Sequence, residues 1–157
     1  MRYGRCCGLH DRPLDSGPKV TSDGVVGLPR DAMCAFYRCG MTYVIGSACV
    51  DVMDKACVQE CPADCIYEGA RSLYINPNEC VDCGACRLVC HVEAIEWETD
   101  LPHDERWHID DNAAFFQTVL PGRSEPLGNP GGAQSVGRVG VDTPLVAAMP
   151  AKPPSDR

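Results

Sequence analysis

The chain has 157 residues, of which 12 are cysteines, and its formal net charge is −8 at pH 7. Residues 41–100 hold eleven acidic and three basic residues, so the acidity lies there, and such a surface excludes nucleic acid as a partner. The N-terminus lacks an apolar export signal and no segment is long enough to span a membrane. We therefore expect a cytoplasmic protein without membrane attachment, whose thiols bind metal rather than form disulfides.

Residues 1–40 contain Gly, Pro, Asp and Ser without a sustained period. No helix or strand is predicted there, and we interpret the segment as an unstructured N-terminal extension. Eight of the 12 cysteines lie between Cys49 and Cys90, so residues 41–100 are expected to be the folded domain. A domain of this size buries little apolar surface, and bound metal would supply the missing stability.

Short β-prone runs and two short helical candidates alternate through residues 41–100. The predicted strands are 42–45, 65–67, 73–75 and 94–98, and the predicted helices are 56–60 and 85–89. The second and third strands form a hairpin. Because Cys57-x₃-Cys61 recurs 29 residues later as Cys86-x₃-Cys90, we predict an α+β fold in which two βαβ halves form a pseudo-twofold βαββαβ unit around the metal.

Residues 101–157 are expected to form a C-terminal extension. Asp110, Asp111 or Asn112 could cap a short helix over 113–120, which Phe115 and Phe116 would anchor on the core. From Pro121 onward the composition is rich in Gly and Pro, and this part is predicted to be a loose tail.

The strongest motif is Cys80-x₂-Cys83-x₂-Cys86-x₃-Cys90. In bacterial two-cluster proteins the fourth cysteine of this run ligates the other cluster. Three thiolates at this spacing wrap one face of a cubane, whereas zinc usually takes two separated C-x₂-C pairs, so a zinc-binding structural module is the weaker alternative. Exchanging the fourth ligands between the halves assigns Cys61, Cys80, Cys83 and Cys86 to a 4Fe–4S cluster.

The other half of the motif lacks one cysteine. Cys49, Cys57 and Cys90 make a three-thiolate site, which predicts a 3Fe–4S cluster because an unligated corner iron is easily lost. The alternative is that Asp51 or Asp54 supplies a carboxylate and completes a second 4Fe–4S cluster.

Four further side chains lie close to the motif in sequence. Cys65 is expected to be a buried unligated thiol, with a role as reserve ligand as the alternative. The three tyrosines of the domain are expected either to cover the clusters or to pack in the core, and these are Tyr43, Tyr67 and Tyr74.

The segments Met41–Ile45, Cys57–Gly69 and Cys80–Cys86 resemble those of the seven-iron ferredoxins of actinobacteria, and the resemblance continues through residues 111–116 and the tail. It implies the bacterial dicluster ferredoxin fold, one 3Fe–4S and one 4Fe–4S cluster, and the two ligand sets given above. It also implies a monomeric one-electron carrier, not an enzyme, that accepts electrons from a ferredoxin reductase and passes them to acceptors such as cytochrome P450. The alternative function is an electron-transfer subunit of a larger redox enzyme.

Two features depart from the family pattern. His91 stands where the family has proline, and it either raises the potential of the neighbouring cluster or is a solvated surface residue. Residues 1–40 have no family counterpart, so we interpret them as a start site assigned too far upstream. The alternative is a genuine leader whose cysteines bind metal.

Overall fold

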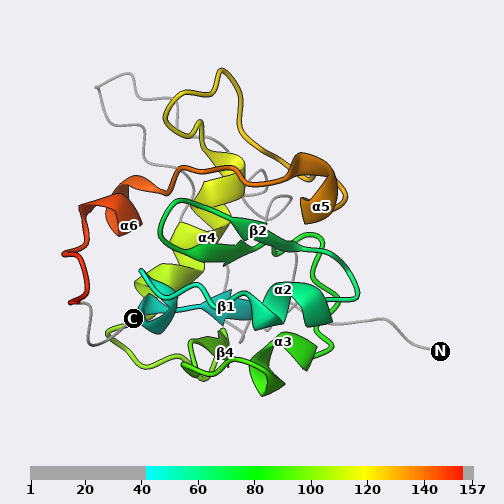
Figure 1. The fold of residues 1–157 in the computed structure, drawn as a ribbon, viewed down its shortest axis with the longest axis vertical. Coiled ribbons are helices and arrows are strands. Elements are labelled where there is room, and N and C mark those ends of the chain that lie inside the picture. The colour runs from blue at the N-terminus through cyan, green and yellow to red at the C-terminus, as the bar shows by residue number, and fades with distance from the viewer. Residues whose placement is uncertain (1–41, 154–157) are drawn as a thin grey trace, which may run out of the picture. The chain divides into compact units, whose positions relative to one another are not determined.

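Two short antiparallel sheets lie at the centre of the fold (Figure 1). The strands are β1 (Tyr43–Ile45), β2 (Ile66–Glu68), β3 (Leu73–Ile75) and β4 (Ile95–Trp97). β1 pairs with β4, and β2 pairs with β3 as the predicted hairpin, with Tyr67 opposite Tyr74. The fold is therefore α+β, with the first and last strands in one sheet and the middle two in the other.

The structure, a computed structural model, describes residues 42–153. The predictions for residues 1–40 lie outside the described residues. Three short helical segments connect the strands: η1 (Ser47–Cys49), α2 (Ala56–Glu60) and α3 (Ala85–Leu88). α2 has its predicted bounds and α3 ends one residue early. These two helices pack against each other (Figure 1), which supports segments too short to be stable alone.

The long helix α4 (Trp107–Gln117) differs from the predicted helix over 113–120. It begins six residues earlier, so Asp110, Asp111 and Asn112 lie inside it and are not its caps. Asn112 instead donates through Nδ2 to Ile45 O at 3.2 Å and accepts from Ile75 N at 3.1 Å. It thereby connects α4 to β1 and β3.

The C-terminal segment belongs to the same unit as the cysteine core. Its helices α5 (Ala133–Val136) and α6 (Pro144–Ala148) are short, but the chain around them is not the loose tail that its composition predicted. The Asp142 carboxylate accepts from Ala70 N, Arg71 N and Tyr74 Oη at 2.9–3.2 Å and holds the segment on the β2–β3 turn. No helix within residues 42–153 is long and apolar enough to cross a bilayer.

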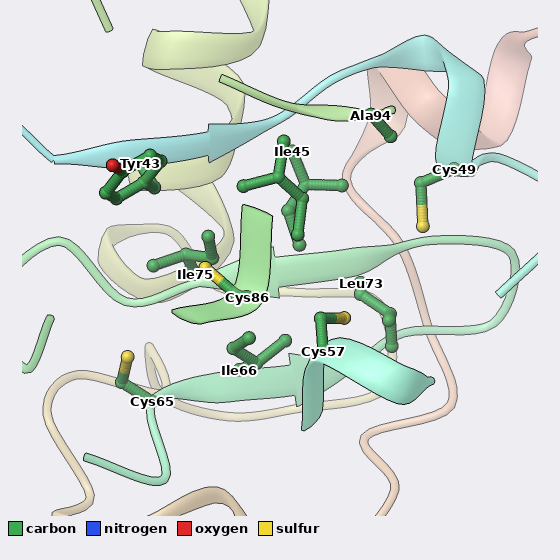
Figure 2. Packing of buried hydrophobic residues seen from close by; sticks show 11 residues of the cluster. Tyr43, Ile45, Cys49, Cys57, Cys65, Ile66, Leu73, Ile75, Cys86 and Ala94 are labelled. Carbon is green, nitrogen blue, oxygen red and sulfur yellow. The ribbon is translucent and has the colours of Figure 1, made fainter. Parts of the chain in front are cut away.

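Buried side chains form two clusters. One contains the cysteines together with aliphatic side chains of all four strands (Figure 2). The other lies under α4, where Tyr74 stacks on Phe115 at 3.9 Å between ring centroids and Tyr67 meets Phe116 edge-on at 5.0 Å. Phe115 and Phe116 are thus the anchors that were predicted, whereas Tyr67 and Tyr74 belong to this second cluster and do not cover the cysteine site.

The backbone repeats a distinctive conformation at intervals of 29 residues. Positive φ angles occur in pairs at corresponding places in the two halves: Met53 (43°) and Asp82 (56°), Lys55 (65°) and Gly84 (75°), Asp64 (50°) and Glu93 (51°). L-residues rarely adopt such angles without structural support. At this spacing α2 corresponds to α3 and β2 to β4.

Candidate metal centre

Four of the predicted ligands line a single cavity. Cys61 follows α2, Cys80 and Cys83 lie in the loop after β3, and Cys86 is on α3. Tyr43, Ile66 and Ile75 form the apolar wall of this cavity. The fold therefore brings the first-half Cys61 to the three second-half thiols with which the motif grouped it.

Cys65 lies next to these four thiols and changes the pKa of two of them. Its Sγ is 3.5 Å from that of Cys61, and its side chain also hydrogen-bonds Cys80. The Cys65 thiol stabilises the neighbouring thiolates and lowers the pKa of Cys61 and of Cys80 to about 6 each, while its own pKa is raised by the same two interactions. A lowered pKa favours the thiolate of Cys61 and of Cys80, and the thiolate is the form that binds iron.

The remaining predicted ligands form a second group. Cys49 lies at the end of η1 and Cys57 on α2, and Figure 2 shows the sulfur of Cys57 pointing towards Leu73 and Cys49, away from Cys86 and Cys65. Burial raises the pKa of Cys57 to about 12, and the charges of Cys49 and Cys90 add to the shift. All eight described cysteines are free thiols. Burial and neighbouring charge disfavour free thiolates in this group, and bound iron would stabilise them.

Both candidate carboxylates are bound elsewhere. Asp51 forms a bidentate pair with Arg71, at 2.8 Å to Nε and 2.7 Å to Nη2. Asp54 Oδ2 lies 2.7 Å from His91 Nδ1, and this contact lowers the pKa of Asp54. At the 29-residue spacing Asp54 corresponds to Cys83, so it stands where the second half has its middle thiolate.

The two groups differ in exposure. In the three-thiol group Cys49 and Cys57 are 5% and 3% exposed and Cys90 is half-buried, whereas in the four-thiol group Cys86 is buried and Cys83 is exposed. Val81 and Leu88 on the same stretch of chain are 63% and 88% exposed. The four-thiol cavity is therefore open to the surface at Cys83, whereas the Cys49 and Cys57 thiols are shielded from it.

Sequence reasoning missed several side chains that support the second group. Ser47 and Ala48, just before Cys49, are contacted by Glu105 and by Lys152. Arg71, which binds Asp51, had no predicted role beyond its charge. These partners are 20 to 105 residues apart in the chain, and no local pattern in the sequence indicates such contacts.

Known proteins are similar to this chain in sequence. A family model described as the 4Fe-4S binding domain matches residues 73–96, which run from β3 through α3 to β4. A ferredoxin of Mycobacterium tuberculosis (strain ATCC 25618 / H37Rv) is 74% identical over 114 residues, which are 73% of this chain and 100% of that protein. The chain belongs to the ferredoxin family.

Two more distant ferredoxins extend the match. One from Streptomyces griseus is 54% identical over 109 residues, 69% of this chain and 96% of that protein. A protein named Ferredoxin 7Fe from Hydrogenibacillus schlegelii is 46% identical over 77 residues, 49% of this chain and 99% of that protein. This ferredoxin is thus similar to actinobacterial ferredoxins and to one named for seven irons, as its motifs indicated, and it is an iron–sulfur electron carrier. Its relatives are named ferredoxins, which are electron carriers rather than enzymes.

Proposed function

We propose that this ferredoxin carries single electrons from a ferredoxin reductase to acceptors such as cytochrome P450 through one 4Fe–4S and one 3Fe–4S cluster, as a monomer in the cytoplasm. The single observation that carries the cluster proposal is the separation of seven thiols into a group of four and a group of three. Each cluster, when bound, takes up and releases one electron. The chain's part is to hold the clusters, shield them and set their potentials.

The ligand sets cross between two halves related by a pseudo-twofold axis, as in dicluster ferredoxins. The repeated positive φ angles and the matching helix and strand positions support this relation. The sulfurs at the crossing positions also have matching environments. Ala94 N donates to Cys90 Sγ at 3.3 Å, and the backbone N–H of Cys65, 29 residues earlier, contributes to the low pKa of Cys61. Cys61 would bind the four-iron cluster with Cys80, Cys83 and Cys86, and Cys90 the three-iron cluster with Cys49 and Cys57.

Asp51 and Asp54 argue for a three-iron cluster in the second site. Both carboxylates are engaged by basic side chains, and hard oxygen donors suit an iron–sulfur cluster less well than thiolates do. A corner iron without a strong ligand is lost, which leaves 3Fe–4S. The first site has four soft donors and keeps its cubane.

The direct test is an iron and sulfide count with electron paramagnetic resonance on full-length protein purified without oxygen. We expect seven irons per chain and a paramagnetic oxidised state that disappears on one-electron reduction. Eight irons with an EPR-silent oxidised state would refute the three-iron assignment. Zinc in place of iron would refute the electron-carrier proposal.

A variant that adds a fourth thiolate ligand also tests the assignment of the three-iron cluster. Asp54→Cys puts a thiol at the position that corresponds to Cys83, and we expect it to bind an eighth iron and to lose the paramagnetic oxidised state. Asp54→Ser is the matched control and should keep seven irons.

Cys65→Ala removes the one described cysteine outside both ligand sets, and it should also keep seven irons while shifting the potential of the four-iron cluster.

A further inference from the structure

The turn that carries Cys49 is held by side chains from distant parts of the chain. Lys152 Nζ donates to Ser47 O at 3.0 Å and to Ala48 O at 2.8 Å. From another part of the chain, the Glu105 carboxylate accepts from Ser47 N at 3.0 Å and from Ser47 Oγ. The two residues before Cys49 are therefore fixed from outside the turn.

The residues after Cys49 are fixed in the same way. Asp51 N donates to Arg71 O at 2.8 Å, and the Asp51 carboxylate accepts from the Arg71 guanidinium and from Lys152 N, the last at 2.9 Å. The pair is sheltered, since the side chains of Arg71 and Asp51 are 22% and 14% exposed. Sheltered bidentate pairs are stronger and more directional than exposed ones.

Arg71 also binds residues 144–152, near the end of the described chain, which we call the C-terminal strap. Its Nη1 donates to Val146 O at 3.1 Å and to Met149 O at 2.8 Å, and its Nη2 donates to Pro150 O at 3.2 Å. One guanidinium thus joins the strap to the Cys49 turn, and Lys152 closes the connection at the end of the strap.

The turn needs such support because its backbone is strained. Asp51 and Met53 have φ angles of 65° and 43°, a region that non-glycine residues occupy only when their surroundings hold them there. Cys49 is one of only three thiolates proposed for its cluster, so a displaced turn would remove a third of the ligands. The four-thiol cavity is lined by other residues than those to which the strap is bonded here.

We propose that the C-terminal strap positions Cys49, through Lys152 and Arg71, and so retains the three-iron cluster specifically. This inference rests on the proposed cluster set. Releasing the strap frees the turn, lets the Cys49 thiolate leave its iron, and exposes that cluster to loss. The four-iron cluster, held by a different set of elements, stays.

Lys152→Met in the full-length holoprotein tests the proposal. The variant keeps most of the apolar stem of the side chain and removes its charged ammonium donor. During anaerobic incubation with a chelator, we expect the paramagnetic oxidised signal to decay severalfold faster than in the parent, with the iron count falling from seven towards four. The signal of the reduced four-iron cluster should decay at the parental rate, and Lys152→Arg should restore much of the retention.

Arg138→Met is the matched control. Arg138 lies in the same C-terminal segment and is 58% exposed, but it contacts Glu68, Gly69 O and Ala70 O and not the Cys49 turn. It should leave both decay rates unchanged. Because Lys152→Met releases the turn from the end of the strap, hydrogen exchange of the peptide over residues 47–53 should also rise in that variant and not in the control.

Three results would overturn the proposal: an unchanged decay rate in Lys152→Met, equal acceleration for both clusters, or a gain to eight irons. A parent protein without a paramagnetic oxidised state is distinguishable from all three. It would refute the proposed cluster set itself, and the inference with it.

Discussion

Gly84 is required for two separate reasons. Its φ of +75° favours glycine, and a Cβ at this position would lie 2.8 Å from Tyr43 Oη. Gly84 directly precedes α3, between the proposed ligands Cys83 and Cys86, and Tyr43 lines the same cavity. The small residue thus allows the ligand loop to lie against β1.

We therefore expect Gly84→Ala to destabilise the protein by about 2–4 kcal/mol, from about 1 kcal/mol of left-handed strain and the remainder from overpacking against Tyr43. Gly122→Ala separates the two effects. Gly122 has a φ of +79°, and a Cβ there would meet nothing within 4 Å, so only the strain of about 1 kcal/mol applies. Urea unfolding of the two holoproteins measures the difference, and equal effects would contradict the role of Tyr43.

His108 gives the stability a pH dependence. It is 2% exposed, its Nε2 lies 3.1 Å from Glu105 Oε2 without forming a hydrogen bond, and burial lowers its pKa. The folded state therefore binds a proton less readily than the unfolded chain does. The contribution of neutral His108 to the free energy of unfolding is complete above the unfolded pKa of about 6.5. This contribution is lost as the pH falls below that value.

Between pH 8 and pH 6 the parent should lose up to about 0.8 kcal/mol more unfolding free energy than His108→Gln. Asp111, whose pKa burial raises, acts with the opposite sign, but it is present in both proteins and largely cancels in the comparison. Denaturant unfolding at the two pH values provides the measurement. Parallel pH profiles would show that His108 does not titrate as proposed.

At the scale of the elements, α4 joins the two sheets through one side chain. Asn112 accepts from β3 and donates to β1, and it also donates to His108 O at 3.0 Å within the helix. It thus satisfies strand groups that the two-stranded sheets leave without a ladder partner.

Asn112→Asp should destabilise the protein by about 3 kcal/mol, because the new carboxylate is buried and leaves Ile45 O without its donor. Gln117→Glu makes the same amide-to-acid change at an exposed site near the end of α4 and should change stability by less than about 0.5 kcal/mol. Thermal unfolding of both variants checks the contrast.

The elements show where sequence reasoning succeeds. The hairpin and α2 were predicted because short β-prone runs and cysteine spacing are local signals. The start of α4 was misplaced because Asp110–Asn112 resemble a cap in sequence, while the true start has no side-chain cap. The C-terminal segment was misread because its order comes from distant hydrogen bonds, such as those of Asp142, and not from any periodicity. The cysteine motif indicated which four thiols line the cavity. No local pattern indicated the distant side chains that contact the Cys49 turn.

At the scale of the whole molecule, the acidic residues are concentrated in residues 41–100, the part that contains every proposed ligand. An acidic carrier attracts a partner with a basic face and separates from it readily, because exposed charges interact weakly in salt. Second-order rates of electron transfer to a basic redox protein should fall about tenfold from low salt to about 0.5 M. Stopped-flow measurements test this, and a rate independent of salt would contradict electrostatic docking.

The exposed position of Cys83 has a further consequence for oxidative damage to the protein. Dissolved oxygen and peroxide diffuse in water and reach the open edge of the four-thiol cavity before they reach the enclosed turn at Cys49. Damage in air should therefore begin at the proposed four-iron cluster, and a sample left in air would become a mixture of chains that retain the proposed three-iron cluster and have lost the other.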